Sequence, residues 1–405
     1  MTRNVLFAGG GTAGHVFPAV AVAQELQRVH PDVQPIFVGT KDRLEGRLVP
    51  EAGYELHHIN VLSLPRRPSP SLLRVPGALR GAVRRCVEVI EEIDAKAVVT
   101  FGGFVSLPAA MAARRLGLPL IVHEQNAVPG LANRLAARWA DRVAITFPGS
   151  ADRFVNPERT VVTGNPVREA ILQLDRDAER EKAARSFRLR WVPRNLLVFG
   201  GSQGARSLNR AIADTFGQWD GEDVQILHAT GLRLYSETAA LWEQARTGGI
   251  DGPRVRCVDF IDDMDAAYAV ADIVVCRAGA TSIAELTALG IPAVLVPYPH
   301  ATADHQLHNA RALAQCGAAV LIEDRELSGA RLVEAVRPWL EDEDALRRAS
   351  RAAKAFGRPD AAANVARLVS EHLPDANGAA DSREPAASTT IAKPQGKRLR
   401  KRRRS

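Results

Sequence analysis

Short runs of apolar residues alternate along the chain with longer segments in which apolar residues recur every three or four positions. The short runs predict β-strands and the longer segments predict helices. The predicted strands of the first half are 4–8, 34–38, 97–101, 120–123, 142–145 and 160–163. Those of the second half are 195–199, 224–229, 254–259, 273–276, 293–297 and 319–322. Because these strands are almost continuously apolar, we expect parallel sheets covered by helices on both faces.

The pattern also starts again halfway along the chain. Residues 5–14 read VLFAGGGTAG and residues 196–205 read LLVFGGSQGA, each as a strand, a glycine-rich turn and the start of a helix. This repetition predicts an α/β protein with two Rossmann-like, doubly wound domains that face a cleft. We place the domains at 1–163 and 164–344, with a helix at about 345–373 packing back on the first domain. Residues 374–405, rich in Ala, Ser, Pro and charge, are expected to be disordered.

Charge and cysteine content narrow the class of protein. The chain has 405 residues and a formal charge of +7, but residues 393–405 hold eight Lys or Arg and no acid, so the remaining 392 residues carry about −1. A nucleic-acid partner is therefore not expected.

The four scattered cysteines indicate reduced thiols in the cytoplasm. We see no signal peptide, and Gly102, Gly103 and Pro108 interrupt the weakly polar stretch 97–113, which argues against a membrane span.

The glycines at 9, 11 and 14 satisfy the pattern GxGxxG. Such a turn can hold an anion at a helix N-terminus, or it can be a tight turn that binds nothing. A dinucleotide site would also place an acid at the tip of the second strand. Residues 37–41 read FVGTK, so that acid is missing and a nicotinamide cofactor is disfavoured. A third glycine turn at 102–103 suits a wide cleft for phosphate-bearing ligands.

Two polar groups of the first half are candidates for acid–base chemistry. His15 follows Gly14 at the start of a helix, where the helix dipole favours a neutral imidazole that could act as general base or could simply cap or pack. The segment 123–126 reads HEQN at another strand tip. It is either solvated loop or the polar lining of a site.

In the second half, residues 277–285 read RAGATSIAE after a predicted strand. Arg277 and the following helix N-terminus could seat a diphosphate, and Glu285 could bind a ribose diol. Equally, Ser282 and Glu285 could form a capping box. Three D-x-D pairs, at 175/177, 263/265 and 342/344, lie in charged helical stretches, so we assign no metal.

The segment 63–85 carries six Arg, no acid and several apolar residues. It could lie on anionic lipid headgroups, or it could be a solvated basic face.

Taken together, the motifs resemble the bacterial N-acetylglucosaminyltransferases that convert lipid I to lipid II in peptidoglycan synthesis, the MurG family. The resemblance covers about residues 4–370. Its motifs are GGGTAGHVFPA (9–19), FGGF (101–104), HEQNAVPG (123–130), GNPVR (164–168), GGSQGA (200–205), FIDDM (260–264), CRAGATSIAE (276–285) and DHQLHNA (304–310). The chain has Ala13 where the family usually has Gly.

The resemblance implies a GT-B fold, an acceptor and membrane side in the first domain, and a UDP-N-acetylglucosamine site mainly in the second. It implies that Thr12, Ala13 and Gly14 face the donor, with Asn126 and Arg168. It places Ser202 at the diphosphate, the backbone of Ile261 at uracil, and Gln306 or its neighbour His305 at the donor sugar. It also implies that Ala280, Thr281, Ser282, Ile283, Ala284 and Glu285 wrap the phosphates and ribose.

The implied reaction is an inverting transfer of N-acetylglucosamine to the 4-hydroxyl of the muramoyl sugar of lipid I, without a cofactor. His15 is the candidate base and Glu124 the reserve. The loop at 9–14 would face the acceptor diphosphate and the loop at 200–205 the donor. The implied location is peripheral, on the cytoplasmic face of the cell membrane, with anionic lipid and other cell-wall synthesis proteins as partners. The alternatives are another GT-B glycolipid glycosyltransferase, a sugar-nucleotide epimerase, or a non-catalytic UDP-sugar sensor.

Overall fold

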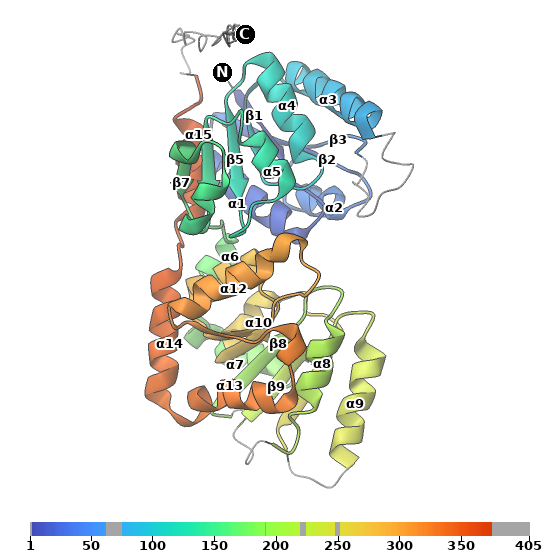
Figure 1. The fold of residues 1–405 in the computed structure, drawn as a ribbon, viewed down its shortest axis with the longest axis vertical. Helices are drawn as coiled ribbons and strands as arrows, with labels where there is room; N and C mark the ends of the chain where they lie inside the picture. Colours follow the sequence, from blue (N-terminus) through green and yellow to red (C-terminus); the bar gives the residue numbers. More distant parts are fainter. Residues whose placement is uncertain (1, 62–74, 191, 219–223, 248–251, 375–405) are drawn as a thin grey trace, which may run out of the picture. The chain divides into compact units, whose positions relative to one another are not determined.

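A computed structural model describes residues 2–61, 75–190, 192–218, 224–247 and 252–374. In the first half, parallel strands form one sheet in the order β3-β2-β1-β4-β5-β6-β7 (Figure 1). These strands are β1 (Arg3–Ala8), β2 (Val33–Gly39), β3 (Leu56–His58), β4 (Ala95–Thr100), β5 (Leu120–Glu124), β6 (Arg142–Ile145) and β7 (Thr160–Val162). Their helices are α1 (Ala13–Val29), α2 (Leu44–Glu51), α3 (Val75–Glu92), α4 (Ser106–Leu116) and α5 (Leu131–Ala136).

The second half forms another parallel sheet, in the order β10-β9-β8-β11-β12-β13. Its strands are β8 (Arg194–Phe199), β9 (Val224–Ala229), β10 (Arg254–Val258), β11 (Ile273–Cys276), β12 (Ala293–Leu295) and β13 (Ala319–Leu321). The helices that follow β7 are α6 (Glu169–Leu172), α7 (Arg176–Ser186), α8 (Arg206–Ala213), α9 (Tyr235–Thr247), α10 (Met264–Val270), α11 (Ala280–Leu289), α12 (His305–Gln315), α13 (Gly329–Glu341), α14 (Glu343–Phe356) and α15 (Ala361–Ser370).

Every predicted strand is present, and the doubly wound α/β fold class is confirmed. Strand β3 was not predicted. It has three residues at the edge of the sheet, and only Leu56 is apolar, so it lacks the apolar run on which the prediction depends.

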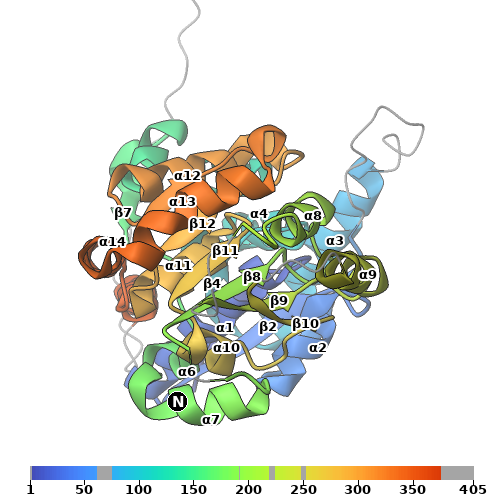
Figure 2. The ribbon, with the colours of Figure 1, turned by 90° about the horizontal axis from the view of Figure 1, so that it is seen from below.

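Continuous apolar runs arise because each central strand is buried on both faces. In β1, Val5 and Phe7 pack in one core cluster while Leu6 and Ala8 pack in another on the opposite face. The second sheet follows the same rule, with α7 and α10 on one face and α8 and α13 on the other (Figure 2). In each parallel sheet, the carboxyl ends of the strands lie on the same side and lead into loops. In this fold class the ligand site is formed by those loops.

The segment 345–373, expected as one helix that returns to the first domain, contains most of α14 and all of α15. Helix α14 packs against α11 and α13 of the second half. Helix α15 packs against α1, and its Val365 and Val369 are fully buried in the same cluster as Val5 and Phe7. The division of the chain at 163/164 and 344/345 stays a prediction. The expected disordered tail lies outside the described residues from 375 onward.

Candidate active site

Helix α1 begins at Ala13, shortly after the first three glycines of the turn at 9–14. Thr12 is its N-cap residue, and within the described residues its side chain makes no capping hydrogen bond, which leaves the N–H groups of the first turn open to another acceptor. Gly14 faces the second half of the chain: a Cβ placed on it would lie 3.6 Å from Oγ1 of Thr281. The start of α1 therefore presents a short row of backbone donors toward the start of α11.

The Glu45 carboxylate, which sequence reasoning missed, holds the other end of this turn. It accepts hydrogen bonds from the Gly11 N–H at 2.9 Å, the Thr40 N–H at 3.2 Å and the Thr40 hydroxyl at 2.5 Å. Glu45 is buried, and a Cβ on Gly10 would lie 2.6 Å from its Oε1. Because the Gly11 N–H already donates to Glu45, it is not free to bind a ligand. The backbone N–H groups of this turn that could bind an anion therefore begin at Thr12.

His15 is oriented by the same turn. Its Nδ1 lies 2.8 Å from the Gly10 carbonyl oxygen and 3.2 Å from Oγ1 of Thr12. Because a carbonyl only accepts, Nδ1 carries the proton and Nε2 keeps its lone pair. Burial lowers the pKa of His15, and the Gly10 hydrogen bond partly opposes that shift. Nε2 faces Gly102, where a Cβ would lie 3.0 Å away, and the positive φ of 96° also favours glycine there.

His123, Glu124 and Gln125 are buried and Asn126 is half-buried, so the HEQN segment is not a solvated loop. The Glu124 carboxylate accepts from the Asn126 N–H at 2.9 Å and side chain at 3.2 Å, the Gly130 N–H at 3.0 Å, and Nδ2 of Asn133 at 2.9 Å. His123 and Gln125 bond to backbone carbonyls. The four donors on Glu124 give it a clear structural role: it fixes the loop that carries Asn126.

Asn309 on α12 joins this loop to the second half. Its Oδ1 accepts from the Ala127 N–H at 2.8 Å, and its Nδ2 donates to Oδ1 of Asn126 at 3.1 Å and to the Ala278 carbonyl at 3.2 Å. Asn309 is fully buried. It lies in the DHQLHNA motif, but the motif alone gave no sign of this contact.

Glu285 lies at the centre of a cluster of polar side chains that it forms with Arg168 and Tyr268. Its carboxylate accepts from Nη2 of Arg168 at 3.1 Å and from the Tyr268 hydroxyl at 2.9 Å. Burial raises the pKa of Glu285, while the Arg168 charge opposes the shift. The Arg168 guanidinium also stands 5.1 Å from the centre of the Phe17 ring on α1. Arg168 thus connects the carboxylate to the first half.

The structure excludes one of the two interpretations of residues 277–285, the capping box. Helix α11 begins at Ala280 with Gly279 as its N-cap, three residues before Ser282. Glu285 bonds to Arg168 and Tyr268, so the capping box is wrong. Within the described part of the chain, the Thr281 hydroxyl is buried and has no hydrogen-bond partner. Ser282, Ile283 and Ala284 continue the first turns of this helix.

Arg277 is engaged by the protein itself. Its guanidinium donates to the Val296 carbonyl at 3.2 Å, to the Pro297 carbonyl at 3.1 Å, to Asp324 at 2.5 Å and to Ser207 at 3.0 Å. The charge thus remains near the α11 N-terminus but in a fixed position.

The remaining expected site residues lie on neighbouring loops. Ser202 is exposed in the turn after β8, and Ile261 is buried just before α10. Oε1 of Gln306 accepts from the Tyr298 N–H at 2.9 Å, and Nδ1 of His305 lies 2.9 Å from the Thr302 carbonyl. Ala303 and Asp304, just before α12, both have positive φ, at 52° and 50°. Strained non-glycine residues of this kind cluster at functional sites.

The three D-x-D pairs have a shared explanation. Asp175, Asp263 and Asp342 are the N-cap residues of α7, α10 and α14, and each accepts a hydrogen bond from a backbone N–H of the first turn. Acids are favoured at helix N-termini by capping and by the helix dipole.

The fold and this site define a glycosyltransferase of the GT-B type. Residues 5–145 match the glycosyltransferase family 28 N-terminal domain, and residues 195–365 match the family 28 C-terminal domain. A crystal structure of MurG from Acinetobacter baumannii superposes with a TM-score of 0.72 and 31% identity, covering 91% of this chain and 99% of that one.

More specifically, the chain belongs to the family of UDP-N-acetylglucosamine--N-acetylmuramyl-(pentapeptide) pyrophosphoryl-undecaprenol N-acetylglucosamine transferases. The relative with this name from Nocardioides is 44% identical over 91% of this chain and 98% of its own length. That from Desulforamulus reducens is 40% identical over 92% and 99%. The resemblance inferred from the motifs is thus confirmed. A UDP-GlcNAc 2-epimerase from Neisseria meningitidis, at 11% identity and a TM-score of 0.68, shares the fold alone.

Proposed function

We propose that this protein transfers N-acetylglucosamine from UDP-N-acetylglucosamine to the 4-hydroxyl of the muramoyl sugar of lipid I, with inversion at the anomeric carbon, to give lipid II. The observation that carries the proposal is identity of 40–44% along nearly the whole length of relatives named for this transfer. Lipid I is an undecaprenyl-diphosphate-linked muramoyl peptide, so one enzyme must bind both a sugar nucleotide and a lipid.

The start of α11 supports the donor half of the proposal. A diphosphate there would meet the Thr281 hydroxyl, which lacks a partner within the described residues, and the N–H groups of Thr12, Ala13 and Gly14 across from it. As UDP leaves, these donors stabilise the growing negative charge. Arg277 is assigned to the same diphosphate, with its charge partly balanced by the Asp324 carboxylate. Ser202 is assigned to the same diphosphate.

The other donor contacts follow from their positions around this helix start. Glu285 is assigned to the ribose diol, because its carboxylate is held in place by Arg168 and Tyr268. We assign the Ile261 backbone to uracil, and Asn126, Arg168 and Gln306 to the donor sugar. Helix residues 280–284 supply the wall around the phosphates.

His15 is the proposed general base. Its Nδ1–H is committed to Gly10, so Nε2 can accept the proton of the attacking 4-hydroxyl. The lowered pKa keeps the imidazole neutral near pH 7. Glu124 remains the second candidate, but the four hydrogen bonds on its carboxylate favour His15.

The acceptor is a membrane lipid, so we also propose peripheral contact with the cytoplasmic face of the membrane. Helix α3 supplies the described part of the basic segment, since residues 63–74 lie outside the described residues. Arg80 is exposed and the Arg84 side chain is 81% exposed, while Cys86 and Val89 pack inward. None of the described helices is long and apolar enough to span a bilayer.

The direct test supplies radiolabelled UDP-N-acetylglucosamine together with a lipid I analogue. We expect label in the lipid product and equimolar release of UDP. Conversion of the donor to another free sugar without lipid labelling would favour the epimerase alternative. Donor binding with no turnover at all would favour the sensor alternative, and either result would reject the transfer.

A further inference from the structure

A cavity of about 450 Å³ lies at the amino end of the second sheet. Its lining includes the first residues of β9 and β10, whereas Arg277 and the 200–205 turn follow the carboxyl ends of β11 and β8. In a parallel sheet, the amino ends of the strands and the carboxyl ends of the strands lie on opposite sides. The cavity is therefore separate from the proposed transferase site. Its lining residues include Arg188, Arg190, Arg246, Arg254, Arg256 and Phe216.

The described lining contains five arginines and no acid. Within the described residues, Arg188, Arg190, Arg246 and Arg256 form no ion pair, and Arg246 donates instead to the Val255 carbonyl at 2.9 Å. Nε of Arg256 is buried and has no hydrogen-bond partner there. A buried guanidinium donor without a partner is costly. The cavity thus concentrates positive charge that an anion would neutralise.

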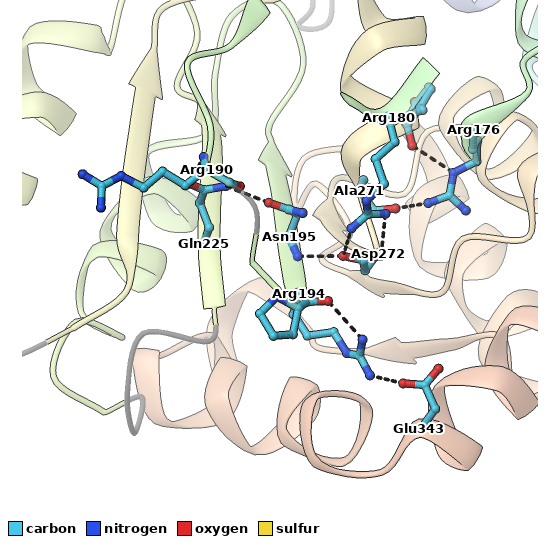
Figure 3. Close-up of polar contacts among 11 residues, drawn as sticks. Arg176, Arg180, Arg190, Arg194, Asn195, Gln225, Ala271, Asp272 and Glu343 are labelled. Atoms are coloured by element: carbon cyan, nitrogen blue, oxygen red, sulfur yellow. Dashed lines mark hydrogen bonds and ion pairs between the residues drawn. The ribbon is translucent and has the colours of Figure 1, made fainter. Parts of the chain in front are cut away.

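The backbone that carries Arg190 is held rigidly. Gln225 accepts from the Arg190 N–H at 3.1 Å and donates to its carbonyl at 3.3 Å, and its amide also donates to Asn195 at 2.8 Å. The nearby Asp272 carboxylate accepts hydrogen bonds from Nη1 and Nη2 of Arg180 and from the Asn195 N–H (Figure 3). Figure 3 shows the Arg190 side chain extending away from this network. Its guanidinium is therefore presented from a fixed support.

Arg188 is kept where glycine would be more stable. It follows the C-cap of α7 with a φ of 55°. Its N–H bonds to the Arg185 carbonyl at 3.0 Å, and the Leu189 N–H bonds to the Ala184 carbonyl at 2.8 Å. This is a Schellman motif, whose left-handed position favours glycine. An arginine there destabilises the backbone while placing one more guanidinium at the cavity.

We propose that this cavity is a second ligand site, which binds a small anion carrying two or more phosphate groups. Guanidinium groups bind phosphate oxygens through paired, charge-assisted hydrogen bonds, and several of them together suit several phosphates. The volume lies within the range of small-molecule sites. The inference does not depend on the transferase proposal.

The test is calorimetric titration of the full chain with tripolyphosphate, with UDP at saturation so that the donor diphosphate site is filled. Saturable binding is expected, and it should weaken as salt is raised. Arg190→Gln and Arg256→Gln should each weaken it about tenfold, as expected for one lost charged contact. Arg337→Gln is the matched control, because Arg337 lies on α13 and pairs with Glu341.

Arg188→Gly separates binding from folding. Glycine suits the left-handed backbone, so this variant should unfold at the same or a higher temperature and yet bind tripolyphosphate more weakly. Absence of saturable binding would overturn the proposal, and so would binding as tight as that of the parent protein by both Arg188→Gly and the Arg190→Gln/Arg256→Gln double variant.

Discussion

The Nδ1 atom of His15 lies 2.8 Å from the carbonyl oxygen of Gly10, which fixes the tautomer with Nε2 unprotonated. If Nε2 is the base, His15→Ala should lower kcat about 10²–10⁴-fold. UDP affinity should change little. His30→Ala, at the other end of α1, is the control. A kcat within twofold of the parent protein would exclude His15 as base.

The same relationship sets a pH dependence. Burial lowers the pKa of His15 from its usual value of 6.5. A base is active when deprotonated, so a lower pKa extends activity to more acidic pH. The acidic limb of the kcat/KM profile should therefore have its midpoint below pH 6.5. A midpoint above that value would show that another group acts as base.

Replacing Glu45 should loosen the first glycine turn. In Glu45→Gln the amide nitrogen cannot accept from Gly11 or Thr40, so one or more buried donors lose a partner. The free energy of unfolding should fall by about 1–3 kcal/mol, and turnover should fall with it. Glu51→Gln, an exposed position on the same helix, serves as control for denaturant unfolding and rate. Equal stability of both variants would contradict the role given to Glu45.

Asn309→Ala should destabilise the contact between the two halves. The change removes three hydrogen bonds from a fully buried amide, which predicts a loss of about 1–3 kcal/mol in the free energy of unfolding. Asn364→Ala should cost less, because within the described residues its side-chain amide accepts a single hydrogen bond, from the exposed Arg367. The expected difference would be disproved by matching unfolding curves.

The buried His228 should make stability depend on pH. Burial lowers its pKa to about 3, while its Nδ1 accepts from the Trp242 indole and its Nε2 bonds to Asn209. Between this value and the usual 6.5 the unfolded chain binds the extra proton, so stability is lost as pH falls. In His228→Asn, the slope of unfolding free energy between about pH 4 and 6 should drop by about 1.4 kcal/mol per pH unit. An unchanged slope would contradict this assignment.

Reversing charge on α3 should weaken attachment to lipid. Each basic residue near an anionic surface contributes about 1 kcal/mol, so Arg80→Glu/Arg84→Glu should reduce vesicle binding about 30-fold or more. Sedimentation with phosphatidylglycerol vesicles measures this, and Arg351→Glu on α14 is the control. If both proteins sediment alike, α3 is not the lipid-binding surface.

The fold was largely predictable because burial on both faces of a strand requires a continuous apolar run, as in β1 and β11. The edge strand β3 does not meet that requirement and was missed. The loops that carry His15 and the start of α11 were predictable because a motif there joins a strand tip to a helix, while the roles given to His15 and Glu285 stay predictions. Glu45, Asn133 and Asn309 were not, because their roles come from tertiary contacts to distant backbone groups that leave no local pattern.

The position of helix α15 affects how the first sheet can fold while the chain is being synthesised. Val365 and Val369 complete the core that Val5 and Phe7 begin, although more than 350 residues of sequence separate the first pair from the second. On the ribosome, the first sheet emerges long before the helix that covers it. Helix α1 covers part of this apolar face early, but the part that α15 covers must stay exposed until synthesis is almost complete, and a fragment ending at residue 163 would keep that part exposed.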